Sequence, residues 1–167
     1  GKAMKPAIEG KKVVAVRRMR RLADIGWVTC IDYSFMAHAV IMAKGIPCAV
    51  DLAPQWTFRS QGHTWNVLKE RMGHMAVFEG VGQPVGMPHK KDHKMAKVYR
   101  RTYSINKVIE DLLKKEKSVP EIFTTPFIKD VTDAYMETVG LNLKPDVRTE
   151  HKYAYLALFD NFKWQPV

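Results

Sequence analysis

Cysteine is scarce in this chain of 167 residues, and long apolar runs are missing from it. The two cysteines, Cys30 and Cys48, form no Cys-x-x-Cys pair, and two cysteines do not make a disulfide framework. No stretch approaches the roughly 18–20 apolar residues of a membrane-spanning helix, and the first residues lack the apolar core of a signal peptide. The chain starts with "GKAMKPAIEG", and its first residue is not methionine. We interpret the chain as an excised or processed piece of a longer protein.

Acidic residues are also few, since 17 Asp and Glu stand against 27 Lys and Arg and leave a net charge of +10. Residues 1–24 carry eight basic and two acidic residues, and residues 87–104 carry six basic and one acidic. Such segments suit phosphates, acidic glycans or anionic protein surfaces, and equally a solvated face that keeps the protein soluble. The aromatic residues follow no RNA-binding signature, and no zinc-finger or basic-zipper spacing is present. We therefore expect no nucleic-acid partner.

The residues after Cys30 predict a helix. Apolar side chains in "CIDYSFMAHAVIMA" cover most of the circumference of a helix, and a helix that is apolar nearly all round is expected to be buried. Gly45 suits the left-handed position that follows a helix, and Pro47 blocks continuation. A short β-branched strand is expected next, in "IPCAVDLA".

The same patterns predict the remaining elements. They are an amphipathic helix over 11–26, two strands joined by a polar turn over 63–80, a strand over 94–104 for which a helix is the alternative, and a charged amphipathic helix over 106–118. Residues after Pro120 are rich in β-branched and aromatic residues separated by turn residues. We expect an α+β core over 1–105, a helical linker over 106–120 and a β-rich segment over 121–167, which is too short to close a β-sandwich by itself.

Cys30 lies at the expected start of a helix, which makes it a candidate nucleophile. The helix dipole and the free N–H groups at such a position stabilise a thiolate over a thiol and lower its pKa. His63 begins an expected strand and supplies a candidate base. If Leu68 pairs with His74 across the following turn, His63 faces Glu79, whose carboxylate would orient the imidazole. A nucleophile, a base and an orienting acid form the general arrangement for covalent acyl transfer.

Cys30 has three alternative interpretations, as a core residue, a metal ligand or half of a disulfide. A cysteine followed by apolar residues is usually a core residue. One possible metal site would use the side chains of Cys30, Cys48, His63 and His74. A second candidate is "HKKDH" over 89–93, which has two histidines at helical spacing. This motif lacks the glutamate of the zincin motif and lies in a segment rich in Gly and Pro. A disulfide between the cysteines is not expected, because a helix of about fourteen residues, roughly 20 Å long, separates them.

The order of these pieces resembles the core of the transglutaminase-like superfamily. Its pattern is a cysteine at a helix start, a turn of the Gly45-Ile46-Pro47 type, a strand, a loop and a His63-Thr64-Trp65 strand. The family usually has Asp on the neighbouring strand, where this chain has Glu79. The sequence over 61–104 is similar to a branch found in large bacterial proteins of the Bacteroides type, and the resemblance extends more loosely over most of the chain.

The resemblance implies a papain-like α+β core in which a Cys-bearing helix packs on an antiparallel sheet. It implies an acyl-thioester mechanism with Cys30, His63 and Glu79 as the catalytic residues, no cofactor and no metal. The substrate would be a peptide, protein or glycopeptide, and we expect a peptidase or amidase rather than a cross-linking enzyme. The alternative is an inactive binding or scaffold module of a bacterial surface protein. A periplasmic or cell-surface location is the corresponding expectation.

Overall fold

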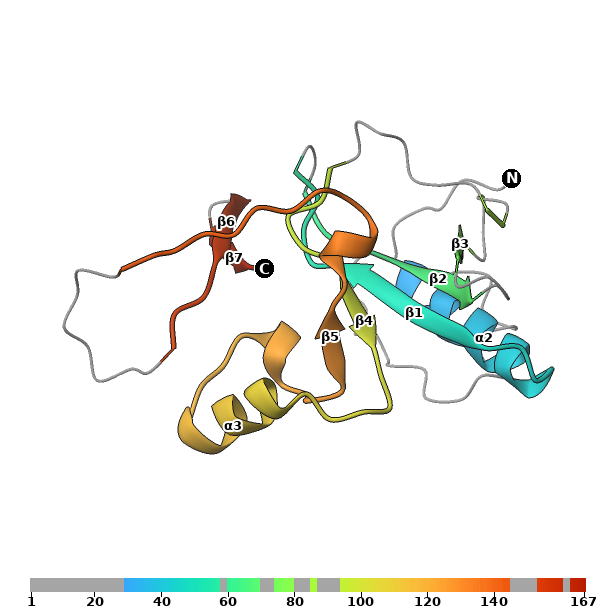
Figure 1. Ribbon diagram of the computed structural model, residues 1–167, viewed down its shortest axis with the longest axis horizontal. Coiled ribbons are helices and arrows are strands. Elements are labelled where there is room, and N and C mark those ends of the chain that lie inside the picture. The colour runs from blue at the N-terminus through green and yellow to red at the C-terminus, as the bar shows by residue number, and fades with distance from the viewer. Residues whose placement is uncertain are drawn as a thin grey trace, which may run out of the picture.

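A helix packed on an antiparallel sheet forms the centre of the protein (Figure 1). The computed structural model describes residues 29–57, 60–69, 74–79, 85–86, 94–144, 153–160 and 163–167. Within these residues the sheet has five strands in the order β3-β2-β1-β4-β5. The expected α+β class, with a helix on an antiparallel sheet, is confirmed, whereas the helix expected over 11–26 lies outside the described residues.

The helices and strands follow each other in the order that the sequence predicts. The strands of the sheet are β1 (Cys48–Ala53), β2 (His63–Lys69), β3 (Met75–Phe78), β4 (Tyr99–Arg101) and β5 (Ile128–Asp130). The helices are α2 (Cys30–Ala43) and α3 (Lys107–Lys115), and two single 3₁₀ turns cover Glu121–Phe123 and Thr132–Ala134. A separate two-stranded hairpin consists of β6 (Ala157–Asp160) and β7 (Lys163–Pro166).

Local signals define both ends of α2. Thr29 is the N-cap residue, and its hydroxyl accepts a hydrogen bond from the backbone N–H of Asp32, while the backbone N–H of Thr29 donates to the Asp32 carboxylate at 2.9 Å. This reciprocal capping box satisfies donors that a helix start leaves unpaired. At the other end Gly45 adopts a φ of 76°, and its N–H donates to the carbonyl of Met42 at 3.0 Å. The predicted stop at Gly45 is therefore confirmed.

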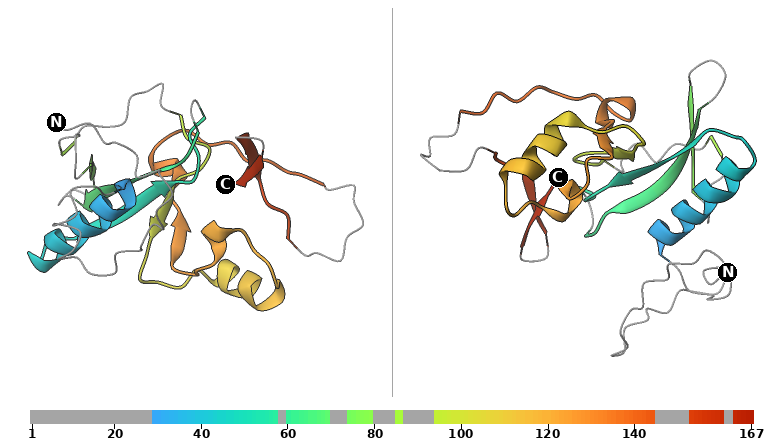
Figure 2. Two further views of the ribbon diagram at one scale, coloured as in Figure 1. Left: turned by 180° about the vertical axis from the view of Figure 1, so that it is seen from behind. Right: turned by 90° about the horizontal axis from the view of Figure 1, so that it is seen from below.

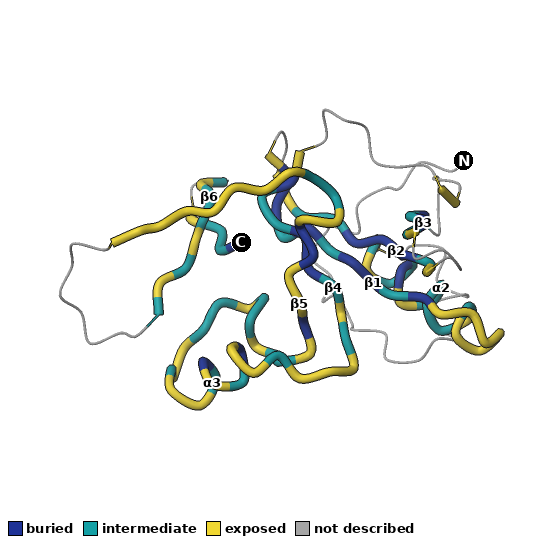
Figure 3. Tube along the Cα trace, viewed as in Figure 1, coloured by how far each residue is buried: buried dark blue, intermediate teal, exposed yellow. Residues whose placement is uncertain are grey.

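The expected burial of α2 is wrong. Ser34 is its only buried residue, whereas Ile31 and Val40 are 52% and 57% exposed. The reason is that β1 and β2 cover only one side of the helix, as the burial pattern in Figure 3 shows. The contact between them is partly polar, since the Asn66 side chain of β2 donates to the carbonyl of Ser34 at 2.9 Å.

Side chains alternate between the two faces of the sheet and build a core on each. On the face opposite α2, Trp65 and Val67 of β2 pack with residues from the 95–136 segment. On the other face α3 packs through Ile109 and Leu113 on Tyr99 and Ile128. The buried stretches of β1, β2 and β4 in Figure 3 are the centre of both layers.

The sheet extends across the boundary that the sequence predicts at residues 106–120. β5 pairs antiparallel with β4, with Tyr99 opposite Asp130, so the segment after the boundary supplies a strand to the core sheet. Part of the β-rich segment expected over 121–167 therefore belongs to the core sheet. Only the β6–β7 hairpin forms a sheet of its own within the described residues, and it lies on the side of the molecule away from α2 in both Figure 1 and Figure 2.

Candidate active site

Cys30 is the first residue of α2, directly after the N-cap Thr29. Its side chain is partly buried, and its thiol is free. Within the described residues its backbone N–H donates to no acceptor, as is usual for the first turn of a helix. A thiol and an unpaired N–H thus share the positive end of a helix dipole, which favours negative charge at this position.

His63 and Glu79 form a short hydrogen bond beside Cys30. His63 is the first residue of β2, and its Nε2 lies 2.7 Å from Oε1 of Glu79, with 17% and 23% of the two side chains exposed. The Cys30 thiol is hydrogen-bonded to the same imidazole. The structure therefore brings the three predicted site residues together.

The pairing that was expected to produce this contact is wrong by two residues. Leu68 pairs with Ala76 and not with His74, so the register places Glu79 opposite Trp65 and diagonal to His63. The contact survives because a shift of two residues leaves every side chain on the same face of the sheet. Diagonal neighbours lie about 7–8 Å apart between strands, within reach of a long side chain.

The two titratable partners at the site shift in opposite directions. The hydrogen bond from His63 lowers the pKa of the Cys30 thiol, against the effect of burial, and the backbone N–H groups of Thr64 and Ile31 lower it further. Burial opposes the charged form of His63, but the hydrogen bonds and charges of Cys30 and Glu79 outweigh it and raise its pKa to about 9. Both shifts favour a thiolate–imidazolium pair, which is the reactive form of a cysteine nucleophile.

Two tryptophans enclose the imidazole. The ring of Trp56 lies 5.8 Å from that of His63, and the ring of Trp65 lies 6.0 Å from it on the same strand. Trp56 is 2% exposed and Trp65 is fully buried. The apolar surroundings strengthen the hydrogen bonds at the site, because charges interact more strongly where water is excluded.

A buried polar network contacts the indole N–H of Trp65. This network was not predicted from the sequence. The Trp65 indole N–H donates to the Tyr135 hydroxyl at 2.9 Å, and that hydroxyl donates to Asp51 at 2.5 Å. Arg100 binds the same carboxylate through two bonds of 2.8 Å. Asp51 is fully buried, so its charge requires these partners. The lone acid inside the apolar strand "CAVDLA" was the available signal, because such a residue demands a partner elsewhere.

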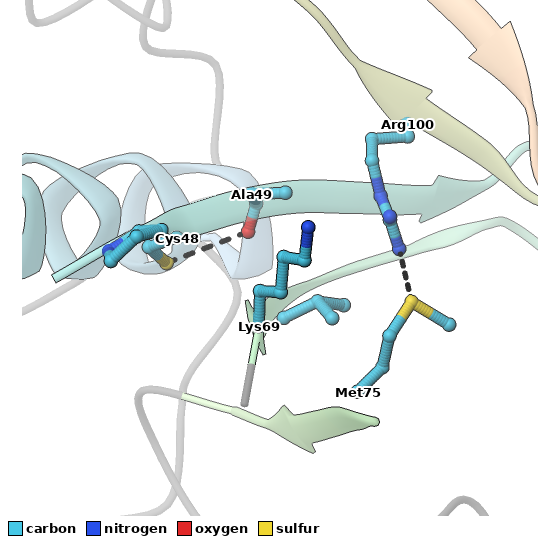
Figure 4. Close-up of a pocket in the computed structure, with 7 residues that line it drawn as sticks. Cys48, Ala49, Lys69, Met75 and Arg100 are labelled. Atoms are coloured by element: carbon cyan, nitrogen blue, oxygen red, sulfur yellow. Dashed lines mark hydrogen bonds between the residues drawn. The ribbon is translucent and has the colours of Figure 1, made fainter. Parts of the chain in front are cut away.

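Cys48 occupies a different environment from Cys30. It begins β1 and lies at a pocket of about 350 Å³ together with Lys69, Met75 and Arg100, as Figure 4 shows. Burial raises the pKa of its thiol, the opposite of the shift at Cys30. Cys48 therefore serves as an internal comparison for Cys30.

The alternative metal site finds no support in the part of the chain that the structure describes. No group of three or more His, Cys, Asp and Glu side chains is placed to hold a metal ion there. The candidates His89 and His93 lie outside the described residues. Of the basic segment over 87–104, Arg100 and Lys97 are already paired with Asp51 and Asp130.

Comparisons of the chain with protein-family models, with curated protein sequences and with solved structures find no match. Within the described residues, no helix has the length and apolarity to cross a bilayer.

Proposed function

We propose that this protein is a cysteine acyl-transfer enzyme that acts on amide bonds through Cys30, His63 and Glu79. The observation that carries the proposal is the hydrogen-bonded line from the thiol at a helix start, through one imidazole, to a carboxylate 2.7 Å away. The proposal includes a papain-like core and the resemblance to the transglutaminase-like superfamily. Its support is the combination of the helix, the antiparallel sheet and the position of the three side chains on them.

The first half of the reaction forms a thioester. The Cys30 thiolate attacks the carbonyl carbon of the substrate amide, and the electron pair of the carbonyl moves to its oxygen. The backbone N–H of Cys30 faces the developing oxyanion, as oxyanion donors do at helix starts. When the tetrahedral intermediate collapses, the C–N bond breaks and the His63 imidazolium gives its proton to the leaving amine.

The second half returns the enzyme to its initial state. His63, now neutral, accepts a proton from the acceptor, which then attacks the thioester carbon. The C–S bond breaks, and the sulfur leaves as the thiolate that the imidazolium stabilises. Glu79 holds the imidazole in one orientation throughout and favours its charged form. We propose water as the acceptor, which makes the overall reaction a hydrolysis.

Trapping of the thioester tests the proposal. The chain is incubated with a pool of fluorogenic tripeptide amides, quenched in acid within milliseconds to seconds, and analysed by intact mass and peptide mapping. We expect an acyl adduct on Cys30 and release of the fluorophore, both absent from Cys30→Ala. The matched control is Cys48→Ala, which removes the other thiol and retains the activity.

Two results would contradict the proposal. Fluorophore release that persists in Cys30→Ala would assign the chemistry to other residues or to a contaminant. Tight binding of peptides with neither acylation nor release, across a pool that varies every position, would support the inactive binding module instead.

A further inference from the structure

We infer that the pocket beside Trp56 binds a basic side chain of the substrate, a lysine or an arginine, through Asp160. This inference rests on the proposed function, because it assigns a specificity to the same site. The pocket has a volume of about 400 Å³. One wall comes from the loop after β1, through Gln55, Trp56, Thr57 and Ser60, and the other wall comes from β6, through Leu158, Phe159 and Asp160.

The pocket adjoins the imidazole. Trp56 lines it and places its ring 5.8 Å from the ring of His63. Two residues of an extended peptide span about 7 Å. A peptide with its amide carbon at Cys30 therefore reaches the pocket with a side chain one or two residues from the bond that is cleaved.

Asp160 gives the pocket its charge preference. The Ser60 hydroxyl donates to one carboxylate oxygen of Asp160 at 2.9 Å. This hydrogen bond joins the two walls of the pocket and orients the carboxylate. Lys163 lies opposite Asp160 in the hairpin, yet no ion pair joins them, and no other described cation pairs with this carboxylate. Within the described residues, a substrate cation at Asp160 would therefore break no existing salt bridge.

The aromatic side chains of the pocket also favour a cation. Phe159 lines the pocket and is 62% exposed, although it lies in a strand. Its ring packs edge-on against Trp164 with 5.4 Å between centroids, which fixes its orientation. Ammonium and guanidinium groups are attracted to aromatic faces, and their aliphatic stems pack on apolar surface. An acidic side chain lacks the attraction to the aromatic face and is repelled by Asp160, so the pocket discriminates by charge.

The test compares tripeptides that differ only at one position, with lysine or its uncharged analogue norleucine. In the first arm the active chain hydrolyses coumarin amides of both, and we expect the lysyl peptide to have a kcat/KM about tenfold higher, the size of one charged hydrogen bond. Asp160→Asn removes that ratio. The matched control Asp111→Asn removes an exposed carboxylate of α3 and retains the ratio.

The second arm separates the pocket from the chemistry. Cys30→Ser forms no thioester, and isothermal titration measures its binding of the same two tripeptides as simple amides. We expect about tenfold tighter binding of the lysyl peptide, lost in the double variant with Asp160→Asn and weakened by salt. Equal affinities for the two peptides, or a preference that survives Asp160→Asn, would overturn the inference. A preference in this arm without hydrolysis in the first arm would support the pocket and contradict the proposed function.

Discussion

His63 and Glu79 are diagonal neighbours on β2 and β3, and not a directly opposed pair. The register places Trp65 opposite Glu79, so the carboxylate must reach one step along the sheet to meet the imidazole at 2.7 Å. The additional methylene of glutamate supplies this reach, which explains why a glutamate and not the shorter aspartate suits this position. The bond fixes the orientation of the imidazole that Cys30 uses.

Glu79→Gln should narrow the pH range over which the chain is catalytically active. The raised pKa of His63, about 9, depends on the hydrogen bond and charge of Glu79. Without that charge the pKa of His63 falls, so the imidazolium loses its proton, and catalysis its general acid, at a lower pH. A weaker imidazolium also stabilises the thiolate less, so the acid side moves to higher pH. The pH dependence of kcat/KM measures both shifts. The pH dependence of Cys30 alkylation measures only the acid side, because the thiolate remains after His63 loses its proton.

Two further variants make the result specific to Glu79. Glu121→Gln removes an exposed carboxylate and leaves the profile unchanged. Glu79→Asp retains the charge but shortens the side chain, and its profile should resemble that of Glu79→Gln because the diagonal contact is lost. An unchanged profile in Glu79→Gln would show that the carboxylate does not act on His63 in solution.

Cys30 should react with iodoacetamide far below the pH at which Cys48 does. The hydrogen bond from His63 lowers the pKa of Cys30, whereas burial raises that of Cys48. Only the thiolate is alkylated, so at pH 6–7 we expect labelling of Cys30 to be at least about tenfold faster. Peptide mapping by mass spectrometry measures the two rates in the same sample, and His63→Ala should reduce the difference, because it removes the largest cause of the lowered Cys30 pKa. Labelling of Cys30 only above the ordinary thiol pKa of about 8.5 would contradict an activated nucleophile.

The features that the sequence predicted depend on local pattern. The stop of α2 at Gly45 requires only a residue that tolerates positive φ, and the strands alternate with a period of two. That period also explains why His63 and Glu79 were placed on one face although the pairing was shifted by two residues. Local pattern could not show how much of α2 the sheet covers, and residues such as Ile31 are therefore exposed against expectation.

The support of the site depends on contacts that are distant in the sequence. Tyr135 and Asp51 are separated by 84 positions, and nothing in either neighbourhood identifies the other. The pairing of β5 with β4 is of the same kind, because it joins a strand before the expected linker over 106–120 to a strand after it. The lone aspartate in an apolar strand indicates that its carboxylate needs a partner. Only the fold shows that Arg100 and Tyr135 are the residues that donate to it.

Tyr135→Phe should destabilise the protein and disturb His63 from a distance. The variant removes the hydroxyl that accepts from Trp65 and donates to the buried Asp51. The loss of a buried hydrogen-bond partner costs about 1–3 kcal/mol in the free energy of unfolding, which urea denaturation measures. Because the Trp65 ring packs 6.0 Å from that of His63, we also expect a lower kcat with little change in KM.

Tyr103→Phe is the matched control for that variant. Its hydroxyl bonds to His38, but the residue is 81% exposed, so water replaces the lost bond and stability changes by less than about 0.5 kcal/mol. Equal stabilities of the two variants would show that the network below Trp65 contributes nothing.

Gly62→Ala should separate β1 from β2 at the point where His63 is positioned. A Cβ atom at Gly62 would lie 2.2 Å from the carbonyl oxygen of Ala53 and 2.6 Å from that of Pro54, both backbone atoms that cannot rotate away. Ala53 pairs directly with His63, so the strands must move apart at the imidazole. We expect a loss of about 1–3 kcal/mol in the free energy of unfolding. In the folded fraction, alkylation of Cys30 should require a more alkaline pH, because a displaced imidazole no longer lowers the thiol pKa.

The control is Gln61→Ala, which retains a side chain at the neighbouring position with its φ of 73° and should alter neither measurement substantially. A Gly62→Ala protein that unfolds and labels like the parent would contradict the close backbone approach that places His63 beside Cys30.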